Sequence, residues 1–294
     1  MTGVSTHVPA EATLSDAWCR SVLAKQGESR FVEVAGGRVH YLAWERANTA
    51  QPVLLLVHGM RGHAHWWDII APYFVDEYKV LAIDLSGMGD SARREVYDND
   101  TFTHDIAGVI EQESSTPVTI FGHSFGGGRT VLACAARPDL FQHAVVIDSP
   151  VWMLGDDRPL FRRQLGGRIY ADRESALARF RLEPEQPVST QVLRAHIAEH
   201  SLHAVSGGWT WKFDPQLASA RTLADPATFG RVRTPMDFVC GELSSVVSKE
   251  RAHRLAAAIT TAHPPVFIPE GHHHLMLDQP LALVSTLRAL LAVR

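Results

Sequence analysis

The sequence predicts an α/β protein with a mostly parallel central sheet, helices on both faces and an inserted helical cap. Short apolar runs, typical of strands buried on both faces, recur along the chain and alternate with stretches of helical spacing. One segment, 151–230, interrupts that alternation. The 294 residues, 46% hydrophobic and 20% charged, suffice for one large α/β domain or for a core with an insertion.

The first elements expected are two strands of a hairpin. Residues 30–34 and 38–44 flank Gly36-Gly37, the turn of an antiparallel pair. Buried strands are then predicted at 53–57, 80–85, 118–121, 144–147, 238–240 and 266–268, and helices at 66–74, 102–112, 126–136, 249–259 and 281–291. Strands and helices in alternation build a mostly parallel sheet that is covered on both faces.

The interrupting segment is rich in Arg, Pro and Trp. Short helices are expected in it at 174–182 and 190–200, and it offers no clear strand. We therefore expect residues 1–150 and 231–294 to form the core, and 151–230 to form a helical cap.

Composition excludes several classes of protein. A formal net charge of -4, with Lys and Arg dispersed, gives no reason to expect binding of nucleic acid or of an anionic membrane. The first thirty residues lack the pattern of a signal peptide, and no apolar run approaches a membrane-spanning length. We expect a cytoplasmic protein without membrane insertion, whose three cysteines are reduced.

The strongest chemical motif is Gly122-His123-Ser124-Phe125-Gly126. It follows a predicted buried strand and precedes a predicted helix, which is the context of a nucleophile elbow. Such a turn strains the serine backbone, and the glycines remove side chains that would clash there. The turn would expose Ser124 and direct the backbone N–H of Phe125 toward an oxyanion. A plain glycine-rich turn is the alternative.

With this motif the chain resembles the α/β-hydrolase superfamily, from about residue 31 to the last predicted helix. The other matching segments are His58-Gly59-Met60 after the third strand, 84–91 after the fourth, and 273–280 near the end. The resemblance implies that the His-Gly loop supplies a second oxyanion donor, the backbone N–H of Met60. A glycine after a buried strand lets the chain turn back across the strand ends. His58 and His123 are expected to be structural.

The general base is sought among three consecutive histidines, 272–274. The resemblance places the catalytic histidine five residues before an acidic residue followed by x-Pro, here Asp278, and this selects His273. Counting from Gly271 selects His272, which stays the alternative. Neighbouring side chains of an extended segment point in different directions, and no His-Glu-x-x-His motif is present, so we expect no metal and no cofactor.

The acidic residue that would orient the catalytic histidine is missing from its usual place in the sequence. Most of the superfamily carries it at the third position after the terminal glycine of a late strand, and that position is Ser244. The resemblance offers a second location, the end of the strand after the nucleophile helix, which some haloalkane dehalogenases use with a glutamate. Asp148 stands there, at the sheet edge where ligands bind in open α/β folds. Glu242 competes for the role, and Asp148 could instead cap a turn.

Five residues are candidates for the substrate pocket: Arg61, His63, Trp152, Met153 and Trp209. Aromatic and thioether side chains suit an acyl or alcohol pocket. Packing of the cap against the core is the competing explanation.

The resemblance implies a serine hydrolase that cleaves a small-molecule carboxylic ester through an acyl-enzyme, with Ser124, His273 and Asp148 as the triad. Alternatives are hydrolysis of a lactone, hydrolysis of a carbon-carbon bond in a diketone-like acid, and a ligand-binding module with little turnover.

Overall fold

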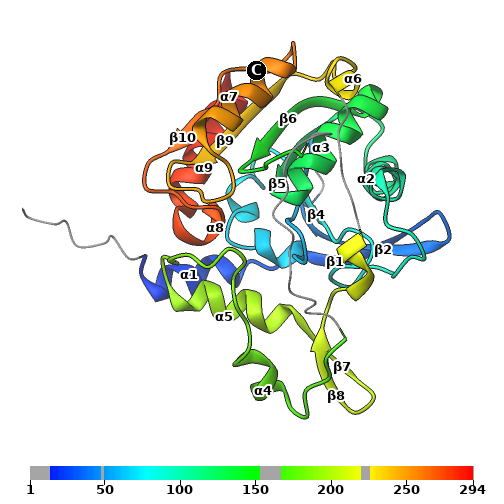
Figure 1. The fold of residues 1–294 in the computed structure, drawn as a ribbon, viewed down its shortest axis with the longest axis vertical. Coiled ribbons are helices and arrows are strands. Elements are labelled where there is room, and N and C mark those ends of the chain that lie inside the picture. The colour runs from blue at the N-terminus through cyan, green and yellow to red at the C-terminus, as the bar shows by residue number, and fades with distance from the viewer. Residues whose placement is uncertain (1–13, 48–49, 153–166, 220–225, 294) are drawn as a thin grey trace, which may run out of the picture.

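The computed structural model describes residues 14–47, 50–152, 167–219 and 226–293, and its centre is an eight-stranded sheet (Figure 1). The strand order is β1-β2-β4-β3-β5-β6-β9-β10. β2 pairs antiparallel with β1 and β4, whereas all other neighbours are parallel. The predicted mostly parallel sheet is therefore confirmed. The strands are β1 Glu28–Val34, β2 Gly37–Trp44, β3 Val53–Val57, β4 Lys79–Ile83, β5 Val118–His123, β6 Phe141–Ile147, β9 Met236–Gly241 and β10 Val266–Ile268.

The central strands are apolar throughout because both of their faces are covered. In β3 all five residues are buried, and Leu55 lies in register with Leu81 of β4 and Ile120 of β5. Side chains alternate between two hydrophobic cores, one on each face of the sheet. Leu55 belongs to the first core, and Leu54 and Leu56 belong to the second.

Helices cover both faces of the sheet. One core contains residues of α2 (Asn99–Glu113), α3 (Phe125–Ala136) and α7 (Lys249–Ala258). The other contains residues of α1 (Asp16–Leu23), α8 (Leu275–Asp278) and α9 (Pro280–Ala292). A short helix, α6 (Pro226–Phe229), precedes β9. None of the helices in the described ranges combines the length and the apolar character needed to cross a membrane.

One local prediction in the core was wrong, and one helix was not predicted. The helix expected at 66–74 is instead a pair of short 3-10 turns, η1 Ala64–Trp67 and η2 Ala71–Tyr73. Pro72 explains the break, because it lacks an N–H and its ring would clash with the preceding turn of an α-helix. The sequence reasoning also missed α1, whose N-terminus is capped by the Ser15 side chain, which accepts a hydrogen bond from the N–H of Trp18.

The described part of the predicted cap contains a hairpin that was not expected. Its elements are α4 Arg173–Leu177, α5 Gln191–His200, β7 Leu202–Val205, β8 Gly208–Trp211 and the 3-10 turn η4 Pro215–Ser219. The turn between β7 and β8 carries Gly207 and Gly208 at φ 89° and 143°, values that favour glycine. The signal was thus present, because two glycines between short apolar runs predict a hairpin.

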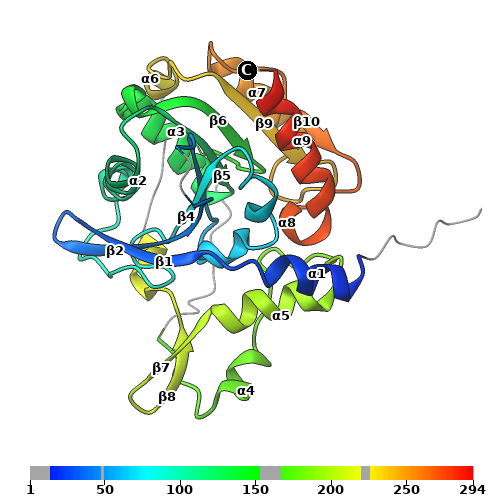
Figure 2. The ribbon, with the colours of Figure 1, turned by 180° about the vertical axis from the view of Figure 1, so that it is seen from behind.

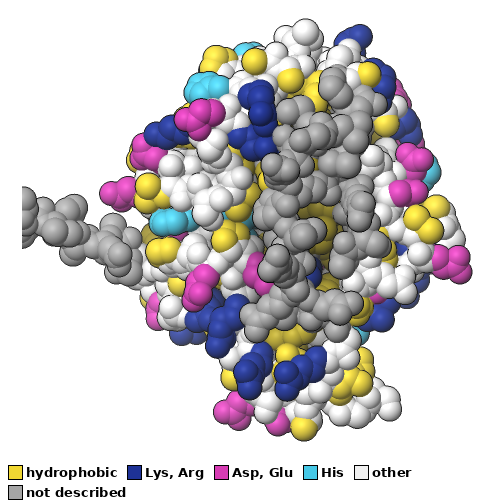
Figure 3. Space-filling view, in the orientation of Figure 1, with side chains coloured by type: hydrophobic (Ala, Val, Ile, Leu, Met, Phe, Trp, Pro, Cys, Tyr) yellow, Lys and Arg dark blue, Asp and Glu magenta, His cyan; other side chains and the backbone are white. Residues whose placement is uncertain are grey.

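The hairpin and α4 project away from the sheet at one end of the molecule, and α5 lies beside α1 (Figures 1 and 2). Residues 153–166 and 220–225 lie outside the described ranges, so the division into core and cap stays a prediction. Acidic and basic side chains both occur across the visible face of the described residues (Figure 3), in line with the dispersed charges of the sequence. Cys19, Cys134 and Cys240 are buried and form no disulfide.

Candidate active site

Ser124 lies on a strained turn between β5 and α3. Its φ is 52° and its ψ is -117°, an unusual conformation for a residue with a side chain. Its N–H donates to the carbonyl of Ile147 at 2.9 Å, which ties the turn to the end of the neighbouring strand β6. The sheet therefore holds this serine at the carboxyl edge of its central strands.

Two glycines make the turn possible. A Cβ atom added to Gly122 would lie 2.5 Å from the carbonyl oxygen of Gly126, and one added to Gly126 would lie 2.5 Å from the carbonyl oxygen of His58. Both contacts are shorter than a carbon and an oxygen tolerate. The Gly-x-Ser-x-Gly spacing is thus a requirement of close backbone packing around Ser124.

The His-Gly loop runs directly against this turn. A Cβ atom on Gly59 would lie 3.3 Å from the Cβ of Ser124, and a hydrogen bond of 3.0 Å from the N–H of Gly62 to the carbonyl of Gly59 closes the loop. Among the described residues, the N–H groups of Met60 and Phe125 have no hydrogen-bond partner. Phe125 is the first residue of α3, where N–H groups lack intrahelical partners, and the role of the two N–H groups as oxyanion donors stays a prediction.

His58 and His123 hold these loops in place, in line with the structural role expected for them. His58 donates from Nδ1 to the carbonyl of Gly59 at 2.7 Å and accepts the N–H of Leu85 at Nε2. His123 donates from Nε2 to the carbonyl of His273 at 2.9 Å. Burial lowers the pKa of both imidazoles, so they are neutral at neutral pH.

His273 and Asp148 form a buried pair at the same edge of the sheet. Nδ1 of His273 lies 2.7 Å from Oδ2 of Asp148, and the two residues are 3% and 0% exposed. Asp148 follows β6, and its Oδ1 accepts the N–H of Gly241 at 2.9 Å. Because Nδ1 donates to the carboxylate, Nε2 of His273 carries the lone pair that a general base needs.

Ser244 contacts this pair directly. Its Oγ donates to Oδ2 of Asp148 at 2.6 Å and accepts the N–H groups of Val246 and Val247, each at 3.1 Å. The buried carboxylate thus receives three donors, an imidazole, a backbone N–H and a hydroxyl, which offset the cost of burying its charge. The residue at the position where the superfamily usually has its acid therefore hydrogen-bonds to Asp148, the candidate acid that follows another strand.

The alternative residues bond elsewhere. His272 donates from Nδ1 to Asp278 at 2.9 Å, so it is oriented toward the short helix α8. Glu242 is exposed and pairs with Lys249 at 3.0 Å. The structure thus brings His273, and neither of these residues, into contact with Asp148.

The candidate pocket residues are dispersed. The Arg61 side chain pairs with Glu183 of the predicted cap at 3.1 Å. His63 is buried, donates to Ser201 at 2.9 Å, and has a pKa that burial lowers well below its usual range. Arg251 covers the ring of Trp152 at 4.4 Å.

Trp209 lies in β8 and packs with the small cluster under the hairpin. Met153 falls outside the described residues. The contacts described for three of the candidates thus lie within the predicted cap or between it and the core: Arg61, His63 and Trp209. The assignment of all five residues to a substrate pocket stays a prediction.

The histidines at the candidate site also form a cluster of a kind that can bind a metal ion. Nitrogen atoms of His123, His273 and His274 lie within 4.8 Å of one another. However, Nδ1 of His273 and Nε2 of His123 are already engaged in the hydrogen bonds described above. The arrangement is better suited to orienting one imidazole than to binding an ion.

Comparison with known proteins identifies a family and a fold. Residues 54–286, well over half of the chain, match the model described as the Alpha/beta hydrolase family. Esterase Rv0045c of Mycobacterium tuberculosis is 26% identical over 278 residues, 89% of each chain. The 2-(acetamidomethylene)succinate hydrolase of Mesorhizobium japonicum is 25% identical over 242 residues, covering 78% of this chain and 84% of the relative.

A solved structure has the same fold. The thioesterase domain from the curacin biosynthetic pathway superposes with a TM-score of 0.74 at 22% identity, covering 88% of this chain and 98% of that domain. At this identity the likeness concerns the fold alone.

Proposed function

The chain belongs to the alpha/beta hydrolase family, and we propose that it is a serine hydrolase that cleaves a small-molecule carboxylic ester through an acyl-enzyme. The observation that carries the proposal is the buried hydrogen bond of 2.7 Å between His273 and Asp148, at the sheet edge that also holds Ser124 on its strained turn. A nucleophile, a base and an acid of the required types thus come from three separate strand ends.

Acylation uses the base and the oxyanion donors together. Nε2 of His273 takes the proton of Ser124 Oγ while Oγ attacks the ester carbonyl. The N–H groups of Met60 and Phe125 donate to the resulting oxyanion, and loss of one such donor typically lowers kcat by about 10²–10³. The intermediate collapses when the imidazolium returns its proton to the leaving alcohol.

Deacylation repeats these steps with water. His273 takes a proton from the attacking water, the oxyanion forms again on the acyl carbonyl, and Ser124 leaves with the proton from the imidazolium. Asp148 keeps Nδ1 protonated and stabilises the charged imidazole in both halves of the cycle. A related esterase supports this reaction class, since Esterase Rv0045c matches this chain over most of the length of both proteins. A lactone would react by the same steps, with the alcohol retained in the product.

Active-site labelling tests the proposal. The full-length protein is treated with a fluorophosphonate probe, and the modified peptide is identified by mass spectrometry. We expect the label on Ser124 and turnover of p-nitrophenyl esters, with a series of acyl lengths and a set of lactones to define the preferred substrate. Ser124→Ala is the control and should take no label. An unlabelled Ser124 in folded protein would contradict the proposal, and labelling without ester or lactone turnover would favour carbon-carbon bond hydrolysis or ligand binding.

A further inference from the structure

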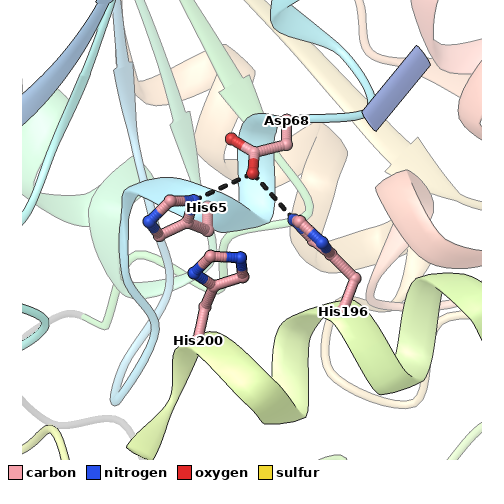
Figure 4. A group of neighbouring side chains, drawn as sticks. All are labelled: His65, Asp68, His196 and His200. Atoms are coloured by element: carbon pink, nitrogen blue, oxygen red, sulfur yellow. Dashed lines mark hydrogen bonds and ion pairs between the residues drawn. The ribbon is translucent and has the colours of Figure 1, made fainter. Parts of the chain in front are cut away.

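A second group of histidines lies far along the chain from the nucleophile, at the junction of the core with the predicted cap. His65 lies in η1 and Asp68 directly follows it, whereas His196 and His200 lie in α5 (Figure 4). The potential ligand atoms of the four side chains all lie within 4.8 Å of one another. Two elements that are about 130 residues apart in sequence therefore direct four such groups toward one point.

The spacing on each element explains this convergence. His196 and His200 are four residues apart on a helix, so their side chains share one face. His65 and Asp68 are three residues apart on a 3-10 turn, where side chains at that spacing lie nearly above one another. Each element thus contributes a pair of ligand groups.

The contacts among the four side chains leave part of the carboxylate unused. Oδ2 of Asp68 accepts from Nδ1 of His65 at 2.9 Å and from Nε2 of His196 at 2.7 Å. The ring of His200 stacks on that of His65 with centroids 3.7 Å apart. Asp68 is 2% exposed, and its Oδ1 is buried without a hydrogen-bond partner among the described residues. Hydrogen bonds within the group alone therefore leave a buried carboxylate oxygen unsatisfied.

We propose that His65, Asp68, His196 and His200 bind one divalent transition-metal ion, with Zn²⁺ as the best fit. Three imidazole nitrogens and one carboxylate oxygen form a ligand set typical of tetrahedral zinc. Since Zn–N and Zn–O distances are about 2.0–2.2 Å, binding would replace the hydrogen bonds of Asp68 to His65 and His196 by bonds from each side chain to the ion.

The site is accessible and has a clear structural consequence. A groove of about 590 Å³ between α1 and α5 is lined by His196 and His200, together with Asp16 and Arg20. Four protein ligands would complete the coordination shell, so the ion would act in structure and not in chemistry. It would join α5 to η1, the turn that follows the loop carrying Met60.

Zinc titration of the full-length protein tests this proposal. After chelator treatment and dialysis, ZnCl₂ is titrated in competition with a chromogenic chelator. We expect each chain to bind one Zn²⁺ ion tightly. The His196→Ala/His200→Ala variant should lose more affinity for Zn²⁺ than the roughly 10–100-fold that is lost when a residue that only supports a ligand is removed. His104→Ala/His253→Ala, which removes two exposed histidines from α2 and α7, is the matched control and should bind like the wild type.

Two further measurements separate ligand loss from misfolding. Circular dichroism checks that each variant is folded, and His200→Gln serves as a milder variant if the double substitution unfolds. Zn²⁺ should raise the Tm of the wild type and of the control by several degrees, and should leave the Tm of either ligand variant unchanged. Co²⁺ should give the visible absorption of a tetrahedral site in the wild type and in the control, and in neither ligand variant. The proposal would be overturned if the wild type bound no Zn²⁺ tightly, or if the double variant bound it as well as the wild type. It would also be overturned if His273→Ala, and not the double variant, lost the binding.

Discussion

Two regions of the molecule combine a histidine–aspartate pair with a serine, which contacts the histidine in one region and lies at the same sheet edge as the pair in the other. In the edge hairpin, Ser29 Oγ lies 2.9 Å from Nε2 of His40, whose Nδ1 lies 2.7 Å from Asp84. At the candidate active site His273 and Asp148 are separated by the same 2.7 Å. The His–Asp geometry therefore does not distinguish the two regions.

The backbone around each serine does distinguish them. Ser29 lies within the extended strand β1, exposed and paired in register with Leu42. Ser124 has a positive φ, and two N–H groups without partners lie in the segments around it. A hydroxyl beside an imidazole becomes a useful nucleophile only where backbone donors are directed at the oxyanion. The strained turn at Ser124 is thus a better indicator of catalysis than the histidine–aspartate pair.

The largest expected difference follows from replacing each serine. Ser124→Ala should lower kcat for an ester substrate by about 10⁶, as loss of a triad nucleophile does in other serine hydrolases. Ser29→Ala should leave kcat within about two-fold, because surface substitutions away from a site have small effects. Steady-state kinetics on the two purified variants compares them. A collapse of activity in Ser29→Ala would reverse the roles assigned to the two regions.

The acid of the candidate site should give the next largest effect. Asp148→Asn preserves shape but lets the imidazole adopt the wrong tautomer, a change that lowers kcat by about 10⁴ in a serine triad. Circular dichroism should show a folded protein, and KM should change much less than kcat. Full activity in this variant would remove Asp148 from the triad.

Asp84 should matter for stability and not for chemistry. Burial alone would raise the pKa of Asp84, but His40, His58 and the N–H of Asp90 outweigh it and hold that pKa well below its usual range. Asp84→Asn should cost about 3–5 kcal/mol in the free energy of unfolding, as measured by urea denaturation, because it breaks a buried pair.

The stabilisation from Asp84 also depends on pH. With a depressed folded pKa, it is complete above the unfolded pKa of about 4 and is lost as the pH falls from there toward the folded pKa. The wild type should therefore lose stability over this acidic range more steeply than Asp84→Asn. Equal slopes for the two proteins would contradict this account of Asp84.

Moving the acid should recover part of the lost activity. Ser244 already donates to the oxygen of Asp148 that binds His273, at 2.6 Å, so a carboxylate at 244 starts close to the imidazole. Ser244→Asp on the Asp148→Asn background should regain about 10–100-fold of the roughly 10⁴ lost. Measuring kcat of the double variant and of Asp148→Asn tests this expectation. If kcat did not recover, only an acid that follows β6 could orient the imidazole.

The smallest effects are expected at the two alternative residues, Glu242 and His272. Glu242→Gln removes only an exposed ion pair with Lys249, and such pairs contribute little because water and salt screen them. His272→Gln removes a bond to Asp278 away from the triad. Both variants should keep kcat/KM within about two-fold of the wild type. A loss of several orders of magnitude in either would reinstate that residue as base or acid.

Long-range contacts explain what sequence reasoning missed. Apolar runs predicted six strands of the main sheet, because burial on both faces leaves a clear pattern, and the turn at Gly36-Gly37 predicted the hairpin of the other two. The hairpin β7–β8 was missed despite its two glycines, since its strands are only four residues each. The pairing of Asp68 with His196 joins residues 128 positions apart, and no local pattern predicts it.

The sequence by itself determined the fold and the nucleophile turn, because periodic burial and the need for glycine at crowded positions are local properties that residue types record. The resemblance favoured His273 and Asp148 among three adjacent histidines and several acidic residues, and it left His272 and Glu242 as alternatives. Only the tertiary structure decided that His273 contacts Asp148, that His272 turns to Asp278, and that Ser244 supports the carboxylate from another strand. A hydrogen bond depends on the distance and direction between two atoms, and the packing of β6, β9 and the loop after β10 sets both.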